Sequence, residues 1–527
     1  MIYIDPPYNT GMEFIYPDKY TESLETYLAY AGLVDDEGRK FSTNTPSEGR
    51  YHTKWLNMMY PRLYLARNLL REDGIIFISI DDNEVSNLRK LCDGVFGEEN
   101  FIDCIIWKKR YGGGAKEKYL VSLHEYVLLY AKNETELNEI FIPLSEDSIR
   151  RYYTQRDSNY STRGPYRTHP LEATKSMGER QNLVFAIPAP DGTEVWPMRQ
   201  WLWGRERVNE ALKKDELEFR QDRDEKWSVH TKQYLKDEEG NIRAGKAFSI
   251  IDDVYTQHGT NEIIDLFGNA QIFPFPKPSG FVEKLLQIGL EDPEDIVLDF
   301  FAGSCATAHA VLNMNRSDER NHMYIMIQLP EPCEEGTEAK EAGYYTIADI
   351  GKERIRRVIQ KIEVEQKNQH PELFEGGKSS LHLGFKVLKL DRSNFKGWDG
   401  TDTKATEEEL GKTLEAFVEH IDPEATQEDI LYELLLKTGF MPTVPIEKLE
   451  LADKTVYSIE EGALLICLED EMTKELIDAM AEAEPQIVIC LDRGFKGNDQ
   501  LKANAVQTFK ARHLGEEKES QIVFRTV

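Results

Sequence analysis

The segment Asp5-Pro6-Pro7-Tyr8 joins a carboxylate to a stiff turn and an aromatic ring. A carboxylate and a backbone carbonyl can each accept one N–H hydrogen bond from a planar amine and turn its lone pair toward a methyl donor. Positioning and electrostatics of this kind can supply most of the rate of the transfer. We therefore predict that Asp5 and the Pro6 carbonyl hold an exocyclic amine such as N6 of adenine. The Pro6-Pro7 turn would aim them, because proline fixes its own backbone.

Tyr8 completes this predicted catalytic motif by offering an aromatic face to the base. An adenine inside a duplex is out of reach, so it must be flipped out, and stacking on Tyr8 would offset the stacking that is lost. Two alternatives stay open at this point. The four residues also fit a rigid Pro-Pro turn with an exposed acid, and motifs of this type occur in methylases of other planar amines.

A second group of residues is suited to binding a nucleoside cofactor. An apolar strand ends at Asp299, and the run Phe301-Ala302-Gly303-Ser304 then opens a helix, so the backbone can approach a nucleoside or its amino-acid tail. Lys277 lies about twenty residues earlier, in a proline-rich stretch at 273–278, and could face the carboxylate of that cofactor. The alternatives are a plain strand–turn–helix connection and a proline-rich entry to a helix.

The apolar pattern predicts the elements that must position these residues. Strands are expected at 2–4, 75–80, 101–107 and 125–131, with helices at 53–71 and from 85 to 95. Pro61 would kink the first helix or divide it in two. This alternation is typical of a parallel α/β sheet. The same pattern resumes with strands at 296–301 and 323–329 and helices at 306–314 and 347–362.

The remaining sequence indicates two further domains. Residues 108–270 have poor periodicity and many Tyr, Arg, Ser, Asn and Gly residues, so we interpret them as an inserted domain. Residues 411–527 predict a smaller α/β domain, with strands at 463–468, 486–491 and 521–526. We thus expect a Rossmann-like α/β sheet in two halves, 1–107 and 271–390, an insert at 108–270 and a C-terminal domain at 411–527.

Charge is uneven along the chain. The net charge of −30 opposes nucleic-acid binding, but residues 401–527 contain 13 basic and 28 acidic residues and so carry half of it. Residues 148–180 contain seven basic and three acidic residues. Because local charge outweighs total charge beyond a Debye length, this segment permits DNA binding. Its candidates for contacts with phosphates or bases are Arg150, Arg151, Arg163, Arg167 and Lys175, and the alternative is a solvated basic loop.

The 527 residues suggest two to four domains. The six cysteines form no CxxC pair and no cluster with zinc-like spacing, so we expect free thiols in a reducing compartment and no metal. No apolar run reaches the roughly 18–20 residues that span a bilayer. The first residues also lack the pattern of a secretory signal. These features predict a cytoplasmic location.

Together these motifs resemble the β-class amino-methyltransferases, and in detail the modification subunit of a type III restriction–modification system. The order and spacing of the motifs carry the resemblance, which runs along the whole chain. The matching stretches are 2–11, 77–84, 124–126, 299–304, 328–331, 350–357 and 494–502.

The resemblance implies a site-specific DNA methyltransferase that uses S-adenosylmethionine and modifies N6 of adenine in a short asymmetric sequence. Residues Phe301, Ala302, Gly303 and Ser304 would line the cofactor site, and Gln328 would hold the ribose hydroxyls. Residues 108–270 would read the double-stranded DNA. Such subunits form homodimers and join a helicase–nuclease restriction subunit, for which the acidic C-terminal domain is a plausible assembly surface; the alternative is a solvated acidic domain.

The sequence departs from the family pattern in two places. Cys305 and Ala306 stand where such loops usually continue with Gly and Thr, and a Cβ at 305 restricts the backbone and would weaken cofactor binding. The segment that usually precedes the catalytic motif, with another strand of the sheet, is also missing before Met1. We expect this form to bind S-adenosylmethionine poorly and to methylate slowly, whereas a form extended upstream would be active.

Two other functions fit the sequence. One is a catalytically impaired DNA-recognition and assembly subunit, consistent with the short N-terminus. The other is methylation of a protein amide or of another nucleic acid. The long middle region favours DNA, since a small substrate needs no such surface. Only the family resemblance favours adenine over cytosine.

Overall fold

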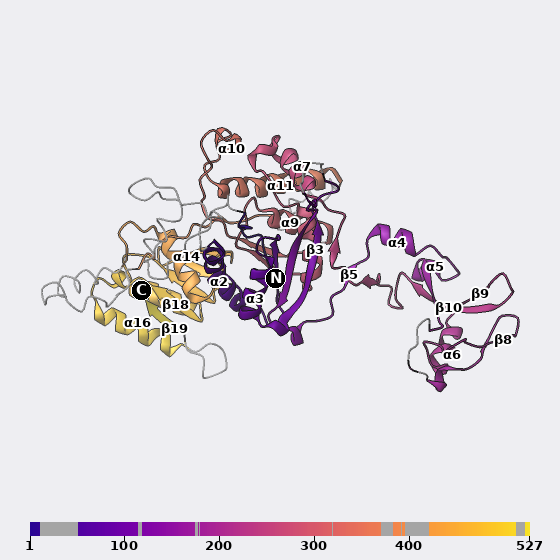
Figure 1. Cartoon of the computed structure of the whole chain (residues 1–527). Coiled ribbons are helices and arrows are strands. Elements are labelled where there is room, and N and C mark those ends of the chain that lie inside the picture. The colour runs from indigo at the N-terminus through magenta and orange to yellow at the C-terminus, as the bar shows by residue number, and fades with distance from the viewer. Residues whose placement is uncertain are drawn as a thin grey trace. The chain divides into compact units, whose positions relative to one another are not determined.

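The computed structural model describes residues 1–10, 51–113, 119–173, 178, 180–318, 320–369, 383–391, 393–395, 421–512 and 522–527. These residues form two compact units, Met1–Leu383 and Gly384–Val527. Figure 1 shows the elements of both units, and each unit is described by itself.

A sheet of seven strands forms the centre of the first unit, in the order β12-β3-β4-β2-β1-β13-β14. The strands are β1 (Ile2–Ile4), β2 (Ile75–Ile80), β3 (Phe101–Lys108), β4 (His124–Ala131), β12 (Ile250–Ile251), β13 (Ile296–Asp299) and β14 (Met323–Met326). β1 lies between β2 and β13 and is parallel to both. The predicted strands in this part of the chain are confirmed within a few residues.

The prediction of a parallel sheet is wrong for β4, which runs antiparallel to both β2 and β3. A parallel neighbour needs a crossover connection, usually a helix, whereas a direct connection reverses the chain. The described residues between β3 and β4 form no helix. The sheet is therefore mixed, and the start of β4 lies at the same edge as the end of β3.

Helices cover both faces of this sheet, because each face presents a row of buried apolar side chains. On one face, α8 (Ser279–Gly289) and α9 (Ala306–Asp318) pack against residues such as Tyr3 and Phe77. On the other, α2 (Tyr51–Leu69) and α3 (Val85–Phe96) pack against the alternate residues of β1 and β2. Pro61 lies inside α2 and does not divide it. The result is a three-layer α/β/α fold.

Three more helices of the first unit pack together: α7 (Thr256–Phe267), which falls within the predicted insert, α10 (Glu338–Glu341) and α11 (Ile347–Gln369). They share a small core that includes Ile263, Ala339 and Ile350. Figure 1 shows α7, α9 and α11 close together, and residues of α11 contact both α7 and α9.

The inserted region has a core of its own, built around Trp201, Leu171 and Val229. Its elements are α4 (Glu146–Tyr152), α5 (Tyr160–Arg163), α6 (Arg205–Lys213), a sheet of β6 (Tyr166–Pro170), β10 (Trp227–Tyr234) and β9 (Leu217–Gln221), and the pairs β5 (Ile142–Pro143) with β11 (Ala244–Gly245) and β7 (Ile187–Pro188) with β8 (Glu194–Val195). β12 falls within the predicted insert but pairs with β3 in the central sheet.

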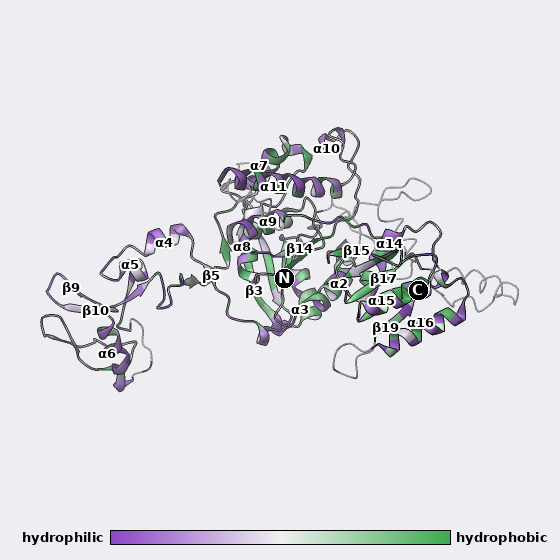
Figure 2. Cartoon of the chain, turned by 180° about the vertical axis from the view of Figure 1, so that it is seen from behind, coloured by the Kyte–Doolittle hydropathy of each residue, from purple (hydrophilic) through white to green (hydrophobic). Residues whose placement is uncertain are grey.

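The second unit contains a five-stranded sheet in sequence order. Its elements are α14 (Gln427–Thr438), β15 (Ile446–Leu451), β16 (Lys454–Ile459), β17 (Leu464–Cys467), α15 (Lys474–Glu482), β18 (Ile487–Cys490), α16 (Asp499–Ala511) and β19 (Val523–Thr526). The predicted strands at 463–468 and 486–491 are confirmed as β17 and β18. Figure 2 shows the hydrophobic colouring concentrated on strands of the two units. Among the residues described in either unit, no helix is long and apolar enough to cross a membrane.

Candidate active site

The two predicted motifs meet at one edge of the central sheet. Asp5 directly follows β1, and Asp299 is the last residue of β13. These strands are adjacent and parallel. Because the carboxyl ends of parallel strands lie at the same edge, the catalytic turn and the cofactor turn become neighbours.

In the structure, the Lys277 side chain lies against the residues of the predicted catalytic motif. Its Nζ is 3.0 Å from Asp5 Oδ1, 2.6 Å from the Tyr8 hydroxyl and 3.1 Å from Glu125 Oε2. The Tyr8 hydroxyl in turn lies 2.9 Å from Asp5 Oδ1 and 3.1 Å from Glu125 Oε2. Lys109 Nζ donates to the other oxygen of Glu125 at 2.9 Å. Two carboxylates and the Lys277 ammonium thus surround one tyrosine hydroxyl, and Lys109 pairs with the outer oxygen of Glu125.

Burial and these charges shift the pKa values of the cluster in different directions. Burial raises the pKa of Asp5 above its usual range, with Lys277 opposing the rise. Burial also acts to raise the pKa of Glu125, but Lys277 and Lys109 outweigh it and the pKa is lowered. For Lys277, burial is overcome by Asp5 and Glu125, which raises its pKa to about 12. Lys277 is therefore a cation at neutral pH.

A set of polar contacts fixes the turn that carries Asp5. Trp55 Nε1 donates to the Pro7 carbonyl at 2.7 Å. Asn9 has a left-handed backbone, with φ of 59°, and donates through Nδ2 to the fully buried Glu84 at 2.5 Å. His52 Nδ1 lies 2.6 Å from the same Glu84 oxygen. These contacts hold the chain directly after the two prolines, as a preorganised site requires.

The cofactor turn is held by hydrogen bonds from within. Asp299 accepts from the Phe301 amide at 3.0 Å and from the Thr307 hydroxyl at 2.6 Å. Burial raises the pKa of Asp299 to about 7, against these two donors. Gln328 Oε1 accepts from the Gly303 amide at 2.7 Å, and its Nε2 donates to Glu331 at 2.9 Å. Gln328, which the family resemblance assigns to the ribose hydroxyls, therefore stabilises the turn itself.

Cys305 adopts the left-handed conformation that glycine favours. Its φ is 60°, and Gly303 has a φ of 51°. Cys305 is buried, and a Cβ added to Gly351 of α11 would lie 2.7 Å from its sulfur. Substitution of the usual glycine by Cys305 is therefore accommodated by the absence of a side chain at Gly351.

A buried ion pair joins the cofactor turn to the entry of α8. Arg354 of α11 is fully buried and donates to the Ser304 hydroxyl at 2.8 Å and to Glu262 of α7 at 2.6 Å. Glu262 also accepts from the Ser279 amide and hydroxyl, at 3.0 and 2.8 Å. Ser279 is only two residues from Lys277, so this pair fixes the two halves of the site relative to each other.

We expect Arg354→Met to lower the free energy of unfolding by about 3 kcal/mol, the lower end of the range for a buried pair, because it removes the cation of a Glu262 carboxylate whose side chain is 20% exposed. Chemical denaturation would measure the change. Arg356→Met is the matched control on the same helix; its guanidinium is half exposed and pairs with Glu353 at 3.7 Å, so its effect should stay below about 1 kcal/mol. Equal effects of the two variants would contradict the expectation.

The predicted DNA-contacting residues fall into two groups. Arg150 and Arg151 are exposed at the end of α4. Arg163 is instead mostly buried, pairs with Glu216 at 3.0 Å and lies 4.2 Å from the centre of the Tyr234 ring. Arg167 donates to Gln233 at 2.7 Å. Lys175 lies outside the described residues.

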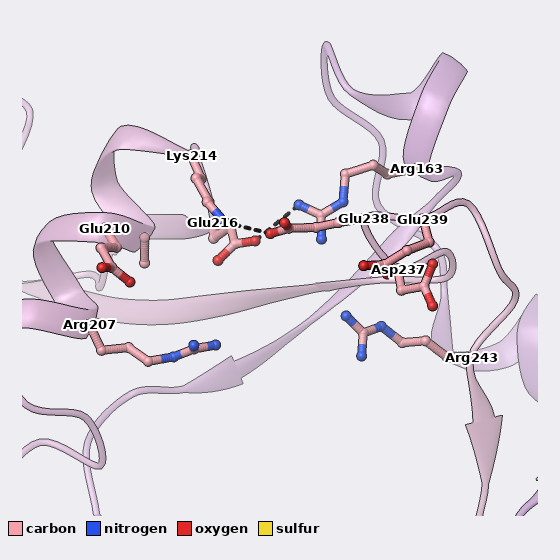
Figure 3. A pocket seen from close by; sticks show the side chains of 10 residues that line it. Arg163, Arg207, Glu210, Lys214, Glu216, Asp237, Glu238, Glu239 and Arg243 are labelled. Atoms are coloured by element: carbon pink, nitrogen blue, oxygen red, sulfur yellow. Dashed lines mark hydrogen bonds and ion pairs between the residues drawn. The ribbon is translucent and has the colours of Figure 1, made fainter.

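Figure 3 shows a polar pocket of about 220 Å³ in the insert, lined in part by Arg163, Arg207, Glu216, Glu238 and Arg243. The figure draws Arg163 and Lys214 directed at acidic side chains of the pocket. Cations and acids alternate around it, so it has neither the charge of a phosphate site nor the residues of the catalytic motif. The described residues that line the pocket all belong to the insert and include none of the predicted catalytic or cofactor-binding residues; Arg163 is a predicted DNA contact.

Sequence reasoning assigned no role to Glu125, Lys109, Glu84, Glu262 and Arg354. Glu125 lies in the segment 124–126 that carried part of the resemblance. It is also a charged residue at the start of the predicted apolar strand 125–131, and this was the available signal. Glu84 and Arg354 lie in the matching stretches 77–84 and 350–357, which was the signal for them. Glu262 lies in none of the stretches, so nothing in the sequence pointed to a pair of Glu262 and Arg354. Their pairing depends on how α7 and α11 pack.

The first unit is a three-layer α/β/α fold that places the two predicted motifs at the ends of adjacent parallel strands. Residues 1–360 match the family model described as DNA methylase, and the chain belongs to this family. It is similar to the Mod subunit of the type III restriction–modification enzyme StyLTI of Salmonella typhimurium, with 34% identity over 69% of this chain and 54% of the relative. It is also similar to the EcoP15I Mod subunit of Escherichia coli and the EcoPI Mod subunit of Escherichia phage P1, at 29% and 30% identity over 96% of this chain and 79% of each relative. The chain thus spans about half the length of the first relative.

Proposed function

We propose that this chain is a site-specific DNA methyltransferase that transfers a methyl group from S-adenosylmethionine to N6 of adenine, as the modification subunit of a type III restriction–modification system. The observation that carries the proposal is the junction at the ends of β1 and β13. There, the acid and aromatic ring of Asp5 and Tyr8 stand beside the turn that follows Asp299. Membership of the DNA methylase family and the Mod subunits among the relatives support it.

The residues at this junction fit the proposed cofactor. S-adenosylmethionine carries a sulfonium cation, an ammonium group and a carboxylate, and it supplies the methyl group. The carboxylates of Asp5 and Glu125 suit the cationic groups, and the Lys277 ammonium suits the carboxylate. Phe301, Ala302, Gly303 and Ser304 would line the site through their backbone, which Gln328 and Arg354 hold in place.

The other residues then act on the target base. Asp5 and the Pro6 carbonyl accept the two N–H groups of the adenine amine and direct its lone pair at the methyl group. Tyr8 stacks on the flipped base, and its hydroxyl is anchored by Asp5, Glu125 and Lys277. Lys277 and Tyr8 both contact Oδ1 of Asp5, so Oδ2 is the oxygen that would accept from the amine.

Sequencing that detects modified bases tests the proposed reaction. DNA from cells that express this chain should carry N6-methyladenine in one short asymmetric sequence, and cells expressing Asp5→Asn should carry none. N4-methylcytosine at that sequence would show that the base is wrong. A lack of any modified base in cells that express this chain would contradict the proposed activity. The homodimer, the restriction subunit as partner and the cytoplasmic location are parts of the same proposal.

Within the insert, we expect exposed arginines to contribute to DNA affinity and buried ones to stability. Arg150→Ala and Arg151→Ala together should weaken DNA binding and lower the slope of log affinity against log salt by roughly two, since each lost phosphate contact releases about one counterion fewer. Fluorescence anisotropy over a salt series measures this slope. Arg163→Ala is the contrasting variant: its contact with Glu216 is internal, so it should lower the melting temperature instead. An unchanged slope in the double variant would contradict the assignment.

A further inference from the structure

Phe275 is the most exposed of the large hydrophobic side chains described in the structure, with 96% of its surface accessible. It also has a left-handed backbone, with φ of 61°. That conformation is rare for residues with a bulky side chain, and it is further restricted by the following residue, Pro276. A strained, solvent-exposed aromatic residue costs stability, and such residues concentrate at functional sites.

The strained backbone is what turns Phe275 outward. In an extended run, residues 273, 275 and 277 would share one side. Phe273 does pack inward, beside Ile272, and a Cβ on Gly303 would lie 3.6 Å from its ring. Lys277 also points inward, to Asp5. Phe275 alone leaves this side, although it lies only two residues from the lysine of the catalytic cluster.

The segment that presents Phe275 is held rigidly by its neighbours. A Cβ on Gly259 of α7 would lie 2.5 Å from the Pro276 carbonyl oxygen, so backbone meets backbone at that point. Glu262 binds the Ser279 amide one turn further along α7. Because these contacts fix the chain on the C-terminal side of Phe275, the ring projects from a segment that is held in place.

Residues suited to a nucleic acid lie near the start of α7, three residues before the contact of Gly259 with Pro276. The start of α7 contacts the segment after β3, where Thr256 donates to the Lys109 carbonyl at 2.9 Å. This segment exposes Arg110 and, with 83% of its surface accessible, Tyr111, whose ring packs edge-on to Tyr255. Aromatic rings beside basic side chains are the combination that binds bases and phosphates together.

We propose that Phe275 inserts into the base stack of the DNA at the position that the target adenine vacates. This inference rests on the proposed function and deepens it. A flipped base leaves an unstacked gap, and apolar side chains that enter the stack fill such gaps in other protein–DNA complexes. Tyr8 inside the site would then stack on the extruded base, while Phe275 outside the site replaces that base in the duplex.

The inference is tested by comparing the affinity for a short duplex that lacks one central base (the gapped duplex) with the affinity for the intact duplex. This test does not require a known target sequence. The wild-type chain should prefer the gapped duplex on the order of tenfold, since stacking on one aromatic side chain is worth a factor of that size. Phe275→Ala should lose the preference, and Phe275→Trp should keep it. Leu69→Ala, which changes an exposed apolar residue at the end of α2, is the control and should also keep it. A preference that survives in Phe275→Ala overturns the inference.

Methylation provides the second readout, on a duplex that carries the sequence found by modified-base sequencing. Phe275→Ala should lower kcat/KM for DNA roughly 10- to 100-fold and leave the affinity for S-adenosylmethionine unchanged. A mismatch opposite the target adenine makes flipping easier and should recover most of the loss. A parallel loss of cofactor affinity would overturn the inference. Failure of the wild-type chain to methylate would instead count against the proposed function, and the gapped duplex would still decide the role of Phe275.

Discussion

Asp5→Asn is expected to lower the rate of methyl transfer at saturating DNA and cofactor on the order of 10²–10³-fold, the usual effect of removing one preorganised polar group at a reacting centre. The amide replaces an anionic acceptor with a neutral group that also donates, so it holds the amine less well. The Tyr8 hydroxyl, at 2.9 Å from Asp5, loses its charged partner as well.

Single-turnover transfer of a labelled methyl group is the measurement for Asp5→Asn, with calorimetric titration of the cofactor beside it. Asp292→Asn is the control, since Asp292 is exposed and its ion pair with Arg71 lies away from the motif. The rate should fall in the first variant alone, while cofactor affinity changes little. A rate within tenfold of the wild type would remove Asp5 from the reaction.

Lys277→Met should produce the second largest effect, and the effect should depend on pH. Burial raises the pKa of Asp5, and Lys277 limits that rise. Without the cation, the pKa of Asp5 rises further, so at neutral pH a smaller fraction of Asp5 is ionised and able to accept the amine. We expect the acid limb of the rate profile to move to higher pH and the rate at pH 7 to fall about 10- to 100-fold.

The pH profile of the methylation rate separates this role from a loss of folding. In Lys277→Met the rate should recover in part as the pH rises, and Lys277→Arg should keep a profile close to the wild type. Circular dichroism would confirm that both variants are folded. An acid limb that stays in place in Lys277→Met would show that Lys277 does not act through the ionisation of Asp5.

The sequence predicted most of the elements around the site because apolar runs there end at strong boundary residues. The predicted strand at 75–80 is β2 in full, and Gly74 precedes it. The direction of β4 could not be read in the same way. The run at 125–131 looks alike in either orientation, and only the connection from β3 decides it.

The partners of the predicted site residues were harder to foresee. Lys277 was placed against a cofactor carboxylate, and the structure brings it to Asp5 and Glu125, a contact between residues more than a hundred positions apart. Arg354 looks like any basic residue of a charged helix until packing buries it. A charge in the core depends on tertiary contacts, and these leave no periodic trace in the sequence. The unusual backbone of Phe275 has no such trace either.

The close approach of Cys305 to Gly351 couples two positions that are far apart in the sequence. A Cβ at 351 would lie 2.7 Å from the Cys305 sulfur, and also 3.2 Å from the Gly303 carbonyl oxygen. The two positions are therefore coupled, because a side chain at 351 can be accommodated only if the Cys305 sulfur moves. We expect residues at these two positions to vary together, so relatives that differ at one of them should be compared at both.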